Sequence, residues 1–148
     1  MVTWSPESVA RLRRISDGCD RSGEIDWLRE ALRRYFEGVS DGLRLEDALE
    51  VAVPQHAAPW WRVEAISRRD GALRELAEKY YPQPSLTQRA VLVEMAIDRY
   101  AGSTWKRDRR RNSCPNNYLG TEFELLFRAF KAHEGMPGGR MLRRILAK

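Results

Sequence analysis

The sequence predicts an all-α protein, a compact bundle of about seven or eight helices. Apolar residues recur at helical spacing along nearly every segment, helix start and stop signals flank several segments, and no segment alternates apolar and polar residues as a half-buried strand does. With 148 residues and 43% hydrophobic content, the chain can bury a core of its own. We therefore expect a single helical domain over residues 1–148, with an acidic N-terminal part (1–57) and a basic part (58–148).

Three helices are predicted in the acidic part. Ser5 is a cap residue, Pro6 suits the first helical position, and Asp17-Gly18 ends the first helix. The second helix covers residues 24–37, and the third is a short acidic helix over residues 45–52. The apolar residues of the second helix share one face. They are Ile25, Leu28, Leu32, Tyr35 and Phe36.

Two short helices are predicted at the start of the basic part. The first covers residues 60–66, where apolar positions fall on one face. The pattern Ser67-x-x-Asp70 then indicates a cap for a separate helix that runs to Tyr81.

A long central helix and a C-terminal helical hairpin complete the prediction. Ser85-x-x-Gln88 is a capping-box pattern, and helical periodicity continues from there across Gly102 to Trp105. Thr121-x-x-Glu124 is a second capping-box pattern, opening a helix that stops at Gly135. The last helix covers residues 140–147.

The net charge of +5 is distributed unevenly. Residues 1–60 hold 8 Lys and Arg against 11 Asp and Glu, a net charge of −3, whereas residues 61–148 hold 18 against 10, a net charge of +8. Clustered Lys and Arg attract polyanions and gain free energy when condensed counterions are released. The second part is therefore expected to meet a polyanionic partner.

The strongest local charge signal is a basic run next to Trp105. Five of the six residues from 106 to 111 are basic: Lys106, Arg107, Arg109, Arg110 and Arg111. Two or three cations would suffice to complement a helix dipole, and arginine forks suit phosphate oxygens. We expect the run to contact nucleic acid, with Trp105 as its anchor in the core. A solvated helix end and an acidic protein partner stay open as alternatives.

The C-terminal helix pair has the outline of a helix-turn-helix. Its second helix would offer Arg140, Arg143 and Arg144 to bases or phosphates in a major groove. Its apolar residues would pack inside; they are Met141, Leu142, Ile145 and Leu146. An ordinary helical hairpin explains the same pattern, and the helices over 73–81 and 85–101 form a rival pair.

No residue constellation predicts an enzyme, a metal site or a cofactor. The two histidines, His56 and His133, have no partner at a spacing that recurs in hydrolases or metal sites, and the phosphate-loop and dinucleotide glycine patterns are missing. Cys19 and Cys114 are expected to be free thiols.

The sequence thus favours a non-enzymatic nucleic-acid-binding protein, with duplex DNA preferred because a helix pair suits a major groove. The alternative is a helical protein–protein interaction module, such as an adaptor, inhibitor or assembly subunit, whose basic face docks on an acidic partner. No apolar run approaches the roughly 20 residues of a membrane span, and the N-terminus lacks the apolar core of a signal peptide. We expect no membrane contact and a cytoplasmic location.

Overall fold

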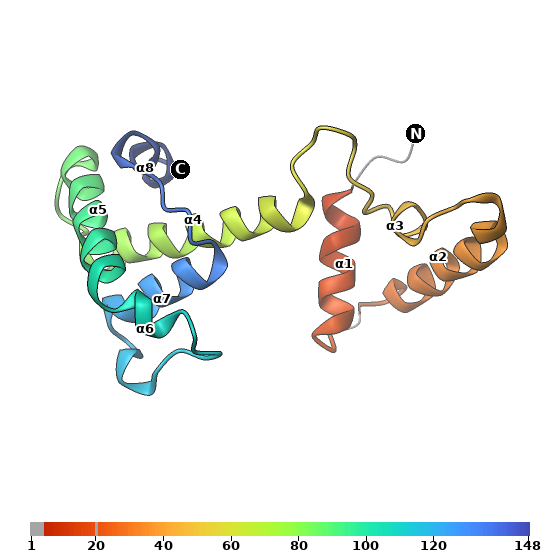
Figure 1. Cartoon of the computed structure of the whole chain (residues 1–148), viewed down its shortest axis with the longest axis horizontal. Coiled ribbons are helices and arrows are strands. Elements are labelled where there is room, and N and C mark those ends of the chain that lie inside the picture. The colour runs from red at the N-terminus through yellow and green to blue at the C-terminus, as the bar shows by residue number, and fades with distance from the viewer. Residues whose placement is uncertain (1–4, 20) are drawn as a thin grey trace. The chain divides into compact units, whose positions relative to one another are not determined.

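The computed structural model describes residues 5–19 and 21–148, and within these ranges it contains eight α-helices and no strand (Figure 1). The all-α prediction is confirmed. Two 3₁₀ turns, Val39–Asp41 and Asn116–Tyr118, lie in the connections. The α-helices are α1 (Pro6–Ser16), α2 (Glu24–Gly38), α3 (Leu45–Ala48), α4 (Trp60–Tyr80), α5 (Leu86–Ser103), α6 (Trp105–Asp108), α7 (Glu122–Ala132) and α8 (Gly139–Leu146).

Backbone contacts divide the chain into two compact units, Met1–Trp60 and Trp61–Lys148, here called the N-terminal and C-terminal units. Helices α1, α2 and α3 belong to the N-terminal unit. Helix α4 begins at the boundary and leads into the C-terminal unit, which also holds α5 to α8. The single domain expected over residues 1–148 stays a prediction.

The C-terminal unit is built around an apolar core that its helices share. Large side chains of α4, α5, α7 and α8 are fully buried in it; they include Leu73, Leu76, Val93, Tyr100, Leu126 and Leu142. Trp105 of α6 is also buried, and its ring centroid lies 5.1 Å from that of Phe130 and 6.2 Å from that of Tyr100. The core therefore fixes α6, with Trp105 as the expected anchor.

Helix α4 is continuous, so the predicted break at Ser67 is wrong. Ser67 is exposed within the helix, and Asp70 accepts hydrogen bonds from Arg69 at 2.7 and 2.9 Å. Arg69 is buried and also donates to the carbonyl of Gly135, in the α7–α8 connection. The contacts of Arg69 and the buried residues Ala72 and Leu73 hold this part of the backbone in helical geometry. They outweigh the capping preference of Ser67 and the helix-destabilising effect of Gly71.

The two predicted capping boxes had different outcomes. At Ser85 both bonds are present: the Gln88 N–H donates to Ser85 Oγ, and the Ser85 N–H donates to Gln88 Oε1 at 3.2 Å. At Thr121 the box is wrong, because the Thr121 hydroxyl donates instead to the Tyr118 carbonyl at 2.7 Å. Glu124 accepts from the Gly120 N–H, and α7 still begins where the sequence predicted.

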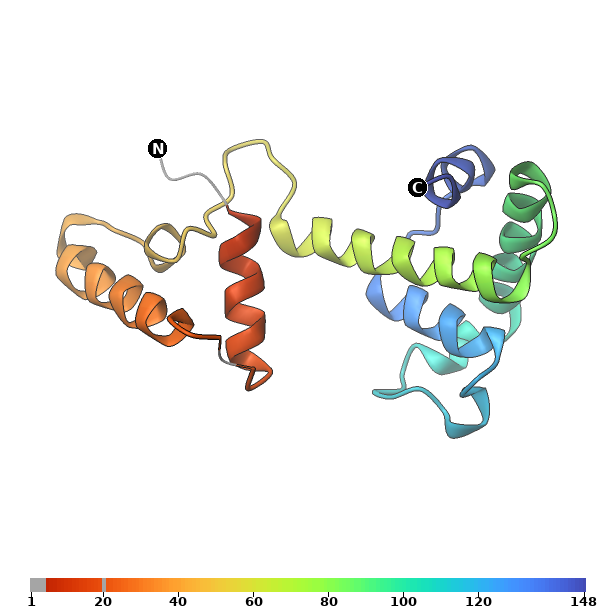
Figure 2. The same ribbon diagram turned by 180° about the vertical axis from the view of Figure 1, so that it is seen from behind.

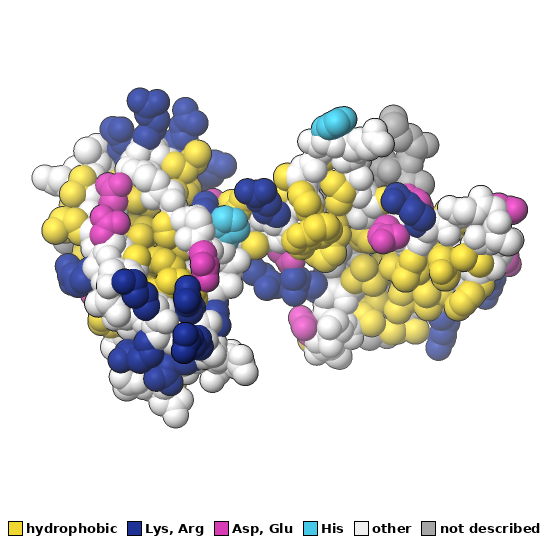
Figure 3. Space-filling model, viewed as in Figure 1, with side chains coloured by type: hydrophobic (Ala, Val, Ile, Leu, Met, Phe, Trp, Pro, Cys, Tyr) yellow, Lys and Arg dark blue, Asp and Glu magenta, His cyan; other side chains and the backbone are white. Residues whose placement is uncertain are grey.

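The N-terminal unit has a much thinner core. Its buried apolar residues, among those described, are Ala31, Ala48, Val51 and Ala52. Phe36, on the predicted apolar stripe of α2, is 71% exposed. Figure 3 shows apolar side chains spread over the surface of this unit. Among the described helices of this unit, only α1 and the single turn of α3 can cover α2, and together they offer too little surface to cover its whole apolar face.

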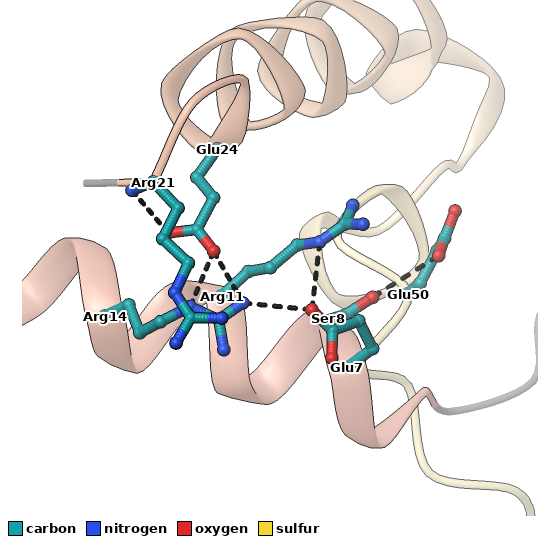
Figure 4. Close-up of polar contacts among 7 residues, drawn as sticks. All are labelled: Glu7, Ser8, Arg11, Arg14, Arg21, Glu24 and Glu50. Atoms are coloured by element: carbon teal, nitrogen blue, oxygen red, sulfur yellow. Dashed lines mark hydrogen bonds and ion pairs between the residues drawn. The ribbon is translucent and has the colours of Figure 1, made fainter. Parts of the chain in front are cut away.

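Polar contacts connect the elements of the N-terminal unit (Figure 4). Glu24, at the start of α2, is buried and accepts from Arg14 Nε of α1 at 2.6 Å and from the Arg21 N–H at 3.2 Å. The hydrogen bond from Arg14 holds the pKa of Glu24 below its ordinary value, although burial opposes this. Ser8 Oγ donates to Glu50 after α3 at 3.3 Å, so α1 is joined to both neighbours.

Candidate nucleic-acid interface

The basic run lies on α6 and the turn that follows it. Lys106 and Arg107 belong to α6, whereas Arg109, Arg110 and Arg111 come after it, and all five are exposed. The long helix was predicted to reach Trp105, but α5 ends at Ser103 and α6 starts after Thr104. The run is therefore displayed by a short separate helix that Trp105 holds against the core.

Asp108, the one acid inside the run, is fully buried beneath it. The Tyr100 hydroxyl donates to Asp108 Oδ2 at 3.0 Å. Arg107 Nε and Arg111 Nε approach Asp108 Oδ1 at 3.4 and 3.3 Å, and Arg107 also donates to the Tyr118 hydroxyl at 3.0 Å. One carboxylate thus orients two arginines of the run and ties them to two core tyrosines.

These contacts keep Asp108 ionised. Burial raises the pKa of Asp108, but hydrogen bonds from Tyr118, Tyr100 and Arg107 outweigh burial, so the pKa lies below its ordinary value. Burial, and then the hydrogen bond to Asp108, raises the pKa of Tyr100 well above its usual range. The tyrosines therefore stay protonated donors, and the charge of Asp108 is met by Arg107 and Arg111.

The other three cations of the run have no such partner. Within the described part of the chain, no carboxylate lies within ion-pair distance of Lys106, Arg109 or Arg110. Since no neighbouring carboxylate of the described residues partly neutralises these three cations, they form the most available part of the run.

A second group of cations lies on α8. Arg140, Arg143 and Arg144 are exposed, whereas Leu142 and Ile145 are buried, as the sequence predicted. Met141, which we expected to pack inside, is 49% exposed. Its position on α8 places it one residue before Leu142, outside the buried stripe.

Helix α8 packs on α5 and makes no close backbone contact with α7. Glu94 of α5 accepts a hydrogen bond from the Gly139 N–H at 3.1 Å, which fastens the first turn of α8 to α5. In a helix-turn-helix the two consecutive helices pack on each other. This arrangement does not favour the helix-turn-helix hypothesis for α7 and α8.

Figure 3 shows Lys and Arg side chains gathered in two places on this face of the C-terminal unit, over α6 and α7 and over α8. Two contributors were missed from the sequence. Arg128 and Lys131 lie three positions apart on α7, and Lys131 Nζ donates to the Arg109 carbonyl at 3.0 Å. Their spacing of three residues on one helix was the available signal for these two cations. The signal for Asp108 was its place as the one acid among the five cations of the basic run.

In the described ranges, no three His, Cys, Asp or Glu side chains lie close enough together to hold a metal ion. No helix of residues 5–19 and 21–148 has both the length and the apolar character for a membrane span. Cys19 and Cys114 are both free.

Comparison with known proteins gives no relative: no protein-family model, no curated protein and no solved structure matches this chain.

Proposed function

We propose that this chain is a non-enzymatic nucleic-acid-binding protein that uses the basic run and the α8 arginines. The observation that carries the proposal is the availability of Lys106, Arg109 and Arg110, which are exposed and lie outside the ion pairs of Asp108. Cations in this state can neutralise phosphates and release counterions.

Duplex DNA is the preferred ligand of this proposal. The exposed arginines of α8 occupy one helix whose buried side is fastened to α5, so the helix presents a rigid basic surface. A helix of this kind suits the width of a DNA major groove, whereas the deep, narrow major groove of A-form RNA admits no side chains.

A helical protein–protein interaction module is the second candidate. Exposed apolar side chains of the N-terminal unit favour it, since Phe36 is 71%, Val39 45% and Leu45 39% exposed. Large apolar side chains that a unit leaves exposed together are typical of protein contact surfaces. In this candidate the basic run docks on an acidic partner.

Fluorescence anisotropy with a labelled mixed-sequence duplex, at several salt concentrations, tests the proposal. We expect binding at low salt, with an association constant that falls linearly on a log–log plot against salt concentration. Matched single-stranded and RNA duplex ligands should bind more weakly. Absence of binding at low salt would contradict the proposal, and co-purification with a stoichiometric acidic protein would favour the second candidate.

A further inference from the structure

Helices α4 and α7 lie side by side in both views (Figures 1 and 2). Side chains of the two helices line an open groove of about 670 Å³, here called the α4–α7 groove. Arg68, Gly71 and Glu75 of α4 and Arg128 and Lys131 of α7 line it, together with two alanines. Its volume falls within the range of about 300–1,000 Å³ that is usual for ligand sites.

The groove is continuous with the basic run. Lys131 lines the groove, and its ammonium donates to the carbonyl of Arg109 at 3.0 Å. The same ammonium lies 6.0 Å from the centroid of the buried Trp105 ring. Lys131 therefore joins the groove to the turn that carries Arg109 and Arg110.

The groove carries an excess of positive charge. Arg68 lies 3.4 Å from Glu64 and Arg128 lies 3.1 Å from Glu75, yet both arginine side chains are 54% exposed. A guanidinium has five N–H donors, so one ion pair leaves donors for an anion. Glu75 is the one acid that lines the groove, and it partly neutralises Arg128.

Gly71 leaves room at the groove wall. It lies inside α4, where glycine is less favourable than alanine, and apart from the neighbouring backbone of α4 a Cβ at this position would meet no atom within 4 Å. The space beside its backbone is therefore open, and a ligand can approach the helix closely there.

We propose that the α4–α7 groove is a second phosphate-binding subsite, which receives the backbone of a nucleic acid beyond the phosphates held by Lys106, Arg109 and Arg110. This inference rests on the proposed function and extends it. Arg68 and Arg128 are the phosphate ligands, Lys131 is a positioning residue, and Glu75 weakens the site.

The first test compares two acids on the same helix. Glu75→Gln removes the groove acid, whereas Glu78→Gln makes the same charge change at an exposed residue that does not line the groove. In anisotropy titrations with a mixed-sequence duplex, Glu75→Gln should tighten binding by about threefold, and Glu78→Gln by clearly less. Equal shifts for the two variants would overturn the inference, because long-range charge alone would then explain both.

The second test fills the groove. Gly71→Glu should weaken binding by roughly tenfold, and Gly71→Gln, which has the same size and no charge, should weaken it less. Melting curves followed by circular dichroism confirm that both variants fold. If both folded variants bind like the wild type, the groove does not contact the ligand.

The two proposals fail in different ways. If the wild type does not bind any duplex, the proposed function fails. If the wild type binds and the run variants weaken binding while the groove variants do not, only the groove inference fails.

A pyrophosphate titration identifies the ligand class. We expect pyrophosphate to displace the duplex no better than sodium chloride of equal ionic strength. Stronger displacement by pyrophosphate would mean that the groove is a small-polyphosphate site instead.

Discussion

The N-terminal and C-terminal units differ in the size of their apolar cores and in how their exposed cations are paired. In the N-terminal unit, arginines lie beside carboxylates, as in the pairs Arg29–Asp26 at 3.1 Å and Arg33–Glu30 at 2.6 Å, while Phe36 is 71% exposed. In the C-terminal unit, aromatic and aliphatic side chains fill a core, while Lys106, Arg109 and Arg110 are exposed and lie outside the ion pairs of Asp108.

In the C-terminal unit, the side chains that stabilise the fold differ from those that we propose to bind a ligand. Exposed ion pairs contribute only about 0–1 kcal/mol each, so the N-terminal unit has weak sources of stability. Burial of large apolar side chains contributes about 1.5–3 kcal/mol each, and the C-terminal unit has many. The core of this unit therefore does not depend on Lys106, Arg109 and Arg110, which lie outside the ion pairs of Asp108 and remain available for a ligand.

The largest expected effect is on folding in isolation. A fragment of residues 60–148, which keeps α4 whole, should fold and unfold cooperatively on heating, because its core is complete. A fragment of residues 1–60 should show no cooperative transition at the same temperature range. Circular dichroism melting curves check both, and a sharp transition of the 1–60 fragment would contradict the comparison.

Single truncations should show the same contrast at a smaller scale. Trp105→Ala empties a buried site, since Trp105 is 8% exposed, and should lower the free energy of unfolding by about 3–5 kcal/mol. Phe36→Ala removes a side chain that is 71% exposed and should change it by about 0.5 kcal/mol or less. Urea unfolding followed by circular dichroism measures both, and similar losses would show that Phe36 is covered in solution.

Asp108 should give the C-terminal unit a specific acid sensitivity. Its pKa is lowered in the folded protein, so the stability that it contributes is fully present above its ordinary pKa of 3.8 and is lost as the pH falls through the lower folded value. Asp108→Asn should lower the free energy of unfolding by about 1–3 kcal/mol at neutral pH, and this loss should shrink in acid.

The matched control for Asp108 is Asp98→Asn, on the exposed side of α5. It should change stability by about 0.5 kcal/mol or less at every pH. Thermal melts between pH 2 and pH 7 compare the two variants, and a loss for Asp108→Asn that is constant with pH would contradict the assigned charge.

The starts of α2, α5 and α7 were predictable because their signals are local. Ser85 and Gln88 form their capping box, and α2 and α5 begin where periodicity and caps placed them. The continuity of α4 was not predictable, since it depends on contacts such as that of Arg69 with Gly135, 66 positions away. The exposure of Phe36 was not predictable either, because periodicity identifies an apolar face but not whether another element covers it.

For the candidate interface, the sequence identified the cations but not how they are used. Exposure of all five residues of the run follows from their charge. Asp108 holds Arg107 and Arg111 and leaves the other three cations without a carboxylate partner among the described residues. This division could not be predicted, because it depends on the burial of Asp108 against Tyr100, which lies eight residues earlier in the chain. The groove depends on the packing of α4 beside α7, for which the sequence carries no local signal.

The salt dependence of duplex binding in two charge-matched triple variants tests the central claim most directly. One variant replaces Lys106, Arg109 and Arg110 with alanine; the control replaces Arg29, Arg33 and Arg44, which are ion-paired in the N-terminal unit. Each lost phosphate contact reduces the slope of log K against log salt by about 0.9, so the first variant should flatten it by roughly two to three and the control by less than one. Equal slopes for the two variants would contradict the claim that the available cations of the C-terminal unit form the binding surface.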